Sequence, residues 1–142
     1  MKIINPKLEW QPVLKTNKTP FKYGDRGFRK YLHNDPAIYR WRRESPDGTI
    51  KQVYIGETAN LRKRVQTHSR GRKNDPYWVR RRFPKKGKIY LDTLKIEDFK
   101  INGIAFSQEN LSCQYIRLVF ENIMLCLAAE EENIEILNRR RR

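Results

Sequence analysis

The sequence predicts an α+β fold in which helices flank a small, mainly antiparallel sheet of three strands. Residues 37–56 alternate as the two arms of a β-hairpin, and residues 107–131 have the apolar composition of a long helix. A third strand is expected over 88–99, between these two segments. A chain of 142 residues can build one hydrophobic core and is short for two.

The hairpin prediction rests on β-forming residues on both sides of a turn. Ala37–Arg43 and Ile50–Gly56 are rich in aromatic and β-branched residues, and the turn residues Ser45-Pro46-Asp47-Gly48 stand between them. The two strands are therefore expected to pair in an antiparallel manner.

A helix is predicted directly after the hairpin, over 57–70. Either Thr58 or Asn60 is a suitable cap, and Leu61 and Val65 share one face of the helix. This face is expected to pack on the sheet.

The long segment at 107–131 is predicted to be the central helix. Its run 115–129 is apolar nearly all round, which is typical of a buried helix. Cys113 and Cys126 lie near or within this run, and two cysteines form neither a disulfide framework nor a zinc site, so we expect buried free thiols. A last short strand is expected at 133–137.

Three regions are expected along the chain: an N-terminal arm at 1–35, a core at 36–138 and a basic tail at 139–142. No stretch approaches the ~20 apolar residues of a membrane span, and the N-terminus lacks the apolar region of a secretion signal. We therefore expect a cytoplasmic protein.

Basic residues dominate the chain and point to a polyanionic partner. Lys and Arg number 31 against 16 Asp and Glu, which gives a formal net charge of +15. The segment 61–88 is the most basic, and we interpret it as a contact surface for nucleic-acid phosphates. Its aromatic residues either stack on bases or anchor the segment to the core. The candidate nucleic-acid-binding residues are Arg62, Lys63, Arg70, Arg72, Lys73, Arg80, Arg81, Arg82, Lys85 and Lys86.

Candidate catalytic residues lie in the hairpin and in the two helices. Tyr39 and Tyr54 belong to adjacent predicted strands, and Arg64 and His68 are four residues apart on one helical face. Glu121 is a carboxylate within an apolar helix, where burial is costly unless a cation is bound. Taken singly, each has a structural explanation: the tyrosines as a cross-strand packing pair, and the glutamate as an ion-pair partner of the arginine four residues earlier.

Together these residues resemble the GIY-YIG nuclease family, in particular its restriction-endonuclease-like members. The first triplet is matched by Ala37-Ile38-Tyr39 and the second by Tyr54-Ile55-Gly56. The family's helix signature is matched by 57–64, followed by His68, and its glutamate on a later helix by Glu121. The resemblance implies a GIY-YIG-like core in the sheet and its flanking helices.

The sequence differs from the family pattern at several positions, and one further position matches it weakly. Ala37 stands where the family has glycine, and Val53 and Glu57 stand where several members have lysine. A late asparagine of the family is matched, weakly, by Asn138, so that the resemblance covers about 36–138.

The resemblance implies a site that hydrolyses phosphodiester bonds with one Mg²⁺ (or Mn²⁺) per active site. Glu121 is then the metal ligand, and Arg64 binds the scissile phosphate. Either Tyr39 or Tyr54 acts on the attacking water, and His68 accepts the proton or orients a tyrosine.

The expected function is a metal-dependent DNA endonuclease, with sequence-specific restriction as the first choice. A phage, mobile-element or structure-specific GIY-YIG endonuclease is the alternative enzyme, and a catalytically inactive DNA-binding module of the same fold is the alternative without activity. The expected partner is double-stranded DNA. Cleavage of both strands with one site per chain implies a homodimer or transient pairing.

Overall fold

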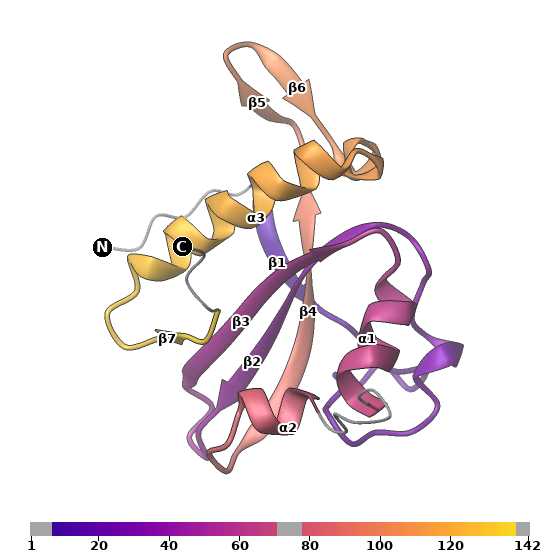
Figure 1. Cartoon of the computed structure of the whole chain (residues 1–142), viewed down its shortest axis with the longest axis vertical. Helices are drawn as coiled ribbons and strands as arrows, with labels where there is room; N and C mark the ends of the chain where they lie inside the picture. The colour runs from indigo at the N-terminus through magenta and orange to yellow at the C-terminus, as the bar shows by residue number, and fades with distance from the viewer. Residues whose placement is uncertain (1–6, 71–77, 139–142) are drawn as a thin grey trace.

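The computed structural model describes residues 7–70 and 78–138, which form an α+β fold (Figure 1). The strands of the described residues are β1 Leu8–Pro12, β2 Ala37–Glu44, β3 Ile50–Thr58, β4 Lys88–Ile96, β5 Phe99–Ile101, β6 Ile104–Phe106 and β7 Glu135–Ile136. The helices are α1 Leu61–Arg70, α2 Trp78–Arg82 and α3 Gln114–Ala129, with 3₁₀ turns η1 Phe28–Lys30 and η2 Gln108–Ser112.

The main sheet is larger than predicted. Its order is β1-β4-β2-β3-β7, and the three central strands are antiparallel, as expected from the sequence. At the edges, β1 pairs antiparallel with β4, and β7 pairs parallel with β3. The segment expected as an arm therefore supplies an edge strand, where Pro12 is tolerated because no further strand needs its missing N–H.

Each face of the sheet carries its own hydrophobic core. Alternation along β2 sends Tyr39 and Trp41 to one face, where they pack with α1, α2 and the buried Phe21 of the N-terminal segment. Ile38 points to the other face and packs with Phe120 of α3. A cleft along β3 is lined by residues from the helices of both faces.

Helix α1 begins later than predicted, because Glu57 and Thr58 continue strand β3. The Asn60 side-chain oxygen accepts the backbone N–H of Lys63 at 3.1 Å. Asn60 is therefore the cap, and the Thr58 hydroxyl accepts the N–H of Asn60 itself.

The helix predicted over 107–131 is confirmed for its run 115–129, but its continuity from 107 and the burial of that run nearly all round were wrong. The helical path breaks at Cys113 into η2 and α3, and α3 packs through one face only, with Phe120 and Met124 buried. Tyr115 on its other face is 80% exposed. Cys113 and Cys126 are also exposed, so the expectation of buried thiols was wrong for the same reason.

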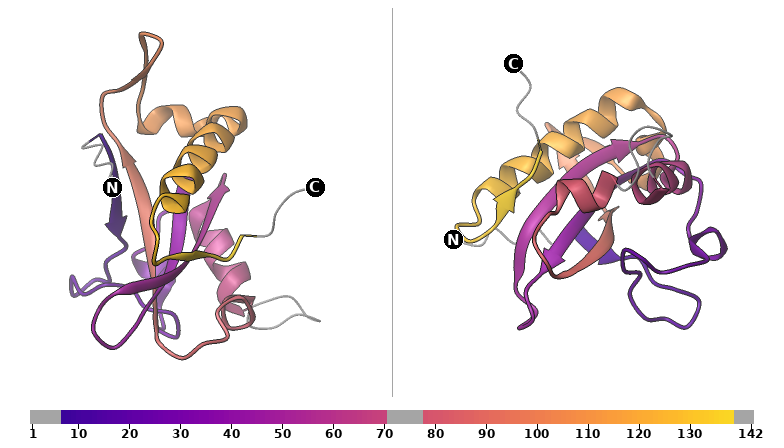
Figure 2. Two further views of the ribbon diagram at one scale, coloured as in Figure 1. Left: turned by 90° about the vertical axis from the view of Figure 1, so that its left-hand side faces the viewer. Right: turned by 60° about the horizontal axis from the view of Figure 1, so that its bottom comes forward.

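The β5–β6 hairpin was not predicted, and it projects beyond the main sheet (Figures 1 and 2). Its turn residues Asn102 and Gly103 have φ of 51° and 79°, the left-handed values of a tight hairpin turn. The Asn-Gly pair between apolar residues is a signal that was available in the sequence.

Among the described residues, no helix is long and apolar enough to cross a membrane.

A buried carboxylate joins β2 to β4. Asp92 is 1% exposed and accepts hydrogen bonds from the guanidinium groups of Arg40, at 2.7 Å, and Arg42, at 2.8 Å. The Arg40 Cζ lies 4.9 Å from the centroid of the Trp10 ring, which covers one side of the guanidinium. Among the described residues, Arg40 pairs with this carboxylate alone, whereas Arg42 also pairs with Glu44.

We expect Asp92→Asn to lower the free energy of unfolding by about 3–5 kcal/mol, because it leaves the largely buried Arg40 guanidinium without a counter-charge and removes one of the two carboxylates that bind Arg42. Urea unfolding measures the change. The control is Glu97→Gln, which removes the partner of Lys95 in an exposed ion pair and should change stability little. Equal effects of the two substitutions would contradict this account of the sheet.

Candidate active site

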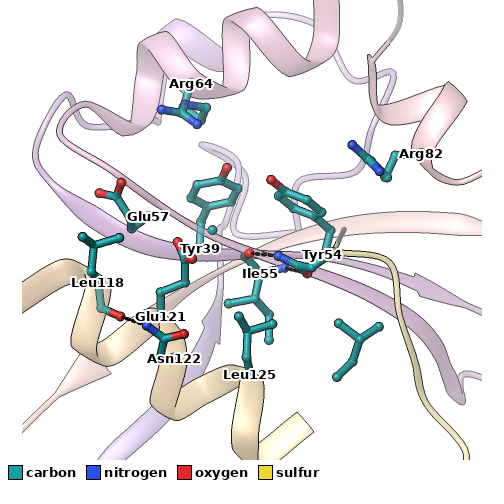
Figure 3. A pocket seen from close by; sticks show the side chains of 13 residues that line it. Tyr39, Tyr54, Ile55, Glu57, Arg64, Arg82, Leu118, Glu121, Asn122 and Leu125 are labelled. Atoms are coloured by element: carbon teal, nitrogen blue, oxygen red, sulfur yellow. Dashed lines mark hydrogen bonds between the residues drawn. The ribbon is translucent and has the colours of Figure 1, made fainter. Parts of the chain in front are cut away.

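A cleft of about 690 Å³ opens where strand β3 meets α1, α2 and α3 (Figure 3). Its lining includes Tyr39, Tyr54, Arg64, Glu121 and Asn138, which come from separate parts of the chain. The structure thus brings together five of the six catalytic candidates expected from the sequence.

The two tyrosines are placed by the register of the hairpin. Tyr39 lies opposite Gly56, and a Cβ atom at Gly56 would stand 2.4 Å from the Tyr39 hydroxyl oxygen. Only glycine leaves room for the ring, which explains the last residue of the second triplet. The rings of Tyr39 and Tyr54 lie 6.4 Å apart, with both hydroxyl groups pointing toward the side of α1 and α2 (Figure 3).

The Tyr39 hydroxyl is buried, and within the described residues it has no well-aligned hydrogen-bond partner. Burial raises the pKa of Tyr39 well above its ordinary value, the neighbouring Tyr54 raises it further, and the guanidinium of Arg64 opposes the change. Tyr39 therefore keeps its proton in the free protein and offers it as a hydrogen-bond donor.

Helix α1 gives its two neighbouring arginines different roles. Leu61 and Val65 are buried and fix the rotation of the helix, so Arg64 lines the cleft. Arg62 points elsewhere, and its Nε and Nη2 donate to the Leu32 carbonyl at 2.9 and 2.6 Å. Arg62 was expected to contact nucleic acid, and in the structure it ties the N-terminal segment to α1.

His68 is buried behind the tyrosines. The Trp41 indole N–H donates to its Nδ1 at 3.0 Å, and the Trp78 ring stacks on it at 3.8 Å. Burial, then the positive charges of Arg64 and Arg82, lower the pKa of His68 from 6.5 to about 3. Of the two roles expected for His68, this arrangement favours orienting the tyrosine rings over accepting a proton.

Glu121 is half-buried on the wall of the cleft. Its alternative role as the partner of Arg117 is disfavoured, because Arg117 donates to Glu57 at 2.6 Å and to the carbonyls of Leu111 and Ser112. Glu57 is therefore engaged by Arg117, and Glu121 is the second carboxylate that lines the cleft.

The donor set of the cleft fits a hard divalent ion that keeps most of its water. Within residues 7–70 and 78–138, no three His, Cys, Asp or Glu side chains gather as a closed metal site. Mg²⁺ is commonly held by one or two carboxylates together with substrate phosphates and water. One carboxylate, Glu121, facing an open cleft meets this description, and a zinc site is not expected there.

Asn138 places the end of the described chain beside the second triplet. Its side-chain oxygen accepts the N–H of Ile55 at 3.0 Å, and its NH₂ donates to the Ile55 carbonyl at 2.6 Å. Both polar ends of the amide are used by the backbone of β3. Asn138 therefore closes one wall of the cleft as an anchor.

The remaining basic candidates divide by exposure. Lys63, Arg80, Arg81, Lys85 and Lys86 are exposed, whereas Arg72, Lys73 and the side chain of Arg70 lie outside the described residues. These exposed cations surround the short helix α2 and the start of α1.

Two features of the basic segment were not foreseen. It contains helix α2, and Arg82 at the end of that helix lines the cleft. Of the two roles expected for its aromatic residues, Phe83 and Trp78 have that of anchors, because Phe83 is fully buried and Trp78 packs on His68, while Tyr77 lies outside the described residues.

No family model, curated protein or solved structure matches the chain. The interpretation of the cleft therefore rests on its own residues and geometry.

We expect acid to destabilise the protein partly through His68. The unfolded chain binds this proton near pH 6.5 and the folded protein only near pH 3, so protons favour the unfolded state between these values. At about 1.4 kcal/mol per pKa unit, the full difference is on the order of 5 kcal/mol. Urea unfolding from pH 7.5 to 3.5 measures it.

The control is His68→Asn, whose side-chain oxygen can still accept the Trp41 N–H but cannot be protonated. Stability of this variant should depend less steeply on pH than that of the wild type. Parallel curves would show that His68 does not carry the effect.

Proposed function

We propose that the protein is a metal-dependent DNA endonuclease of the GIY-YIG type that hydrolyses phosphodiester bonds. One observation carries the proposal: Tyr39, Tyr54, Arg64 and Glu121 line a single cleft, although they are spread over more than eighty residues of sequence. A packing pair, a surface arginine and a structural ion pair would have no reason to converge.

The chemistry requires a group that binds the phosphate and stabilises its developing charge. The Arg64 guanidinium is half-buried and makes no ion pair with a carboxylate of the described residues, so it is available to bind two phosphate oxygens. The Tyr39 hydroxyl lies beside the Arg64 guanidinium, keeps its proton and is closed off from solvent, so we assign it to positioning that guanidinium.

The attacking water needs a residue that solvent can reach. Tyr54 is only half-buried, whereas Tyr39 is sealed in the core, so burial favours Tyr54 for orienting the water and receiving its proton. Glu121 would hold Mg²⁺ or Mn²⁺ in the cleft, and a bound divalent ion supplies charge stabilisation to the phosphate and the leaving oxygen.

We infer that the substrate is double-stranded DNA and that the enzyme is of the restriction type. The exposed cations around α2 and α1 support the choice of a polyanion, because they lie on the elements that also supply Arg64 and Arg82 to the cleft. A basic surface on the same elements as the cleft supports an enzyme whose core itself contacts the DNA.

Plasmid and phage DNA incubated with Mg²⁺, followed by mapping of the ends, tests the proposal. Discrete ends identify a sequence-specific enzyme, and a smear identifies a nonspecific or structure-directed nuclease. Tight binding without any cut would support the inactive DNA-binding module. Linear product without a nicked intermediate would indicate that two copies act together.

We expect Arg64→Ala to abolish cleavage while most of the DNA affinity remains, because one phosphate contact is a small part of a large basic surface. Gel-shift binding and plasmid cleavage measure the two effects. The matched variant is Arg62→Ala, two residues earlier on α1, which should lower Tm by loosening the Leu32 contact. Loss of cleavage in folded Arg62→Ala and normal cleavage by Arg64→Ala would overturn the assignment.

A further inference from the structure

Most of the buried and half-buried arginines in the described residues donate to a hydrogen-bond acceptor of the protein, and two arginines of the cleft differ from them. Arg64 and Arg82 are half-buried, and neither makes an ion pair with a described carboxylate. The others bond to carboxylates or to neutral oxygens: Arg40, Arg42 and Arg117 to Asp92, Glu44 or Glu57, and Arg43 and Arg62 to a glutamine side chain or to backbone carbonyls.

The fold holds Arg82 in place from both sides. Val79 and Phe83 of the same segment are fully buried, which fixes the rotation of α2. The loop that follows is tied down because Arg43 donates to the Lys86 carbonyl at 3.0 Å. The Arg82 side chain thus reaches the cleft from a rigid base.

The Arg82 guanidinium lies over aromatic rings at the cleft wall. Its Cζ is 5.7 Å from the centroid of the Tyr54 ring and 5.2 Å from that of Trp78. Stacked on these rings, the guanidinium is oriented while its N–H groups can still bind an acceptor.

The cleft therefore has two cationic corners, Arg64 on the side of Tyr39 and Arg82 on the side of Tyr54 (Figure 3). Both positive charges act on His68, which lies behind the tyrosines. Two partly desolvated cations in one cleft favour the entry of anions, because neither forms an ion pair with a described carboxylate. A single phosphate at Arg64 would leave Arg82 without one.

We propose that Arg82 is a second phosphate-binding residue of the cleft, which holds the phosphate next to the scissile one on the same strand. This inference rests on the proposed nuclease function. With Arg64 on the scissile phosphate, a second contact fixes the direction of the strand and the position of the phosphorus relative to Tyr54.

The test uses a duplex oligonucleotide with a mapped cut site, in which single phosphates are replaced by neutral methylphosphonates. In the wild type, neutralising the phosphate next to the scissile one should lower kcat/KM by about 10-fold or more, as expected for a lost bidentate contact. Arg82→Gln should show the same loss on the normal duplex and no further loss on that modified duplex.

Arg81→Gln, the neighbouring substitution on α2, is the matched control. It should respond to the methylphosphonate as the wild type does. Arg82→Lys keeps the charge without the planar group, and we expect partial recovery of kcat/KM from it. A purely structural role of Arg82 on Trp78 and Tyr54 would instead lower Tm and leave the methylphosphonate response as in the wild type, which would overturn the inference.

The outcome separates this inference from the proposed function. If the wild type cuts and Arg82→Gln still responds to the methylphosphonate, the inference fails and the nuclease function stands. If the wild type cuts no DNA, the nuclease function fails, and the same oligonucleotides are compared by binding affinity. In that case, a methylphosphonate effect missing only from Arg82→Gln supports a phosphate contact at Arg82, and identical effects in all variants exclude it.

Discussion

The antiparallel register of β2 and β3 is the constraint on which the rest of the structure depends. It sets Tyr39 opposite Gly56 and Trp41 opposite Tyr54, so that all four residues lie on one face of the sheet. A slip by one residue between these strands would place the two tyrosines on opposite faces of the sheet. The missing side chain of Gly56 stabilises this register, because any Cβ there would overlap the Tyr39 ring.

The register also determines what can surround the tyrosines. The face that carries the tyrosines is covered by α1, with its buried Leu61 and Val65, and by α2. Each of these two helices places one arginine above the rings. Helix α3 lies on the opposite face and reaches the cleft through Glu121. The cleft therefore has two cations on one side and a carboxylate on the other, an arrangement that suits a phosphate bound together with a divalent ion.

Local sequence signals were sufficient for the hairpin, for α1 and for most of the candidate site. Arg64 and His68 could be predicted to share a helical face because their spacing alone determines it. Arg82 could not be distinguished from Arg80 and Arg81, since three consecutive arginines carry the same local signal. Only the burial of residues on either side of them decides which one turns to the cleft, and that is a tertiary effect. The exposed face of α3 was missed for a similar reason, because apolar composition predicts burial without showing that a second packing partner exists.

Replacement of Glu121 by Gln tests the central claim most directly, because it removes a charge and keeps the shape of the side chain. Melting, DNA binding and cleavage over a range of Mg²⁺ concentrations are measured on this one variant. The account predicts an intact fold, DNA binding equal to or slightly stronger than that of the wild type, and no cleavage at any Mg²⁺ concentration. A stable variant that cleaves DNA fully, or one with a lower Tm and intact cleavage, would contradict it.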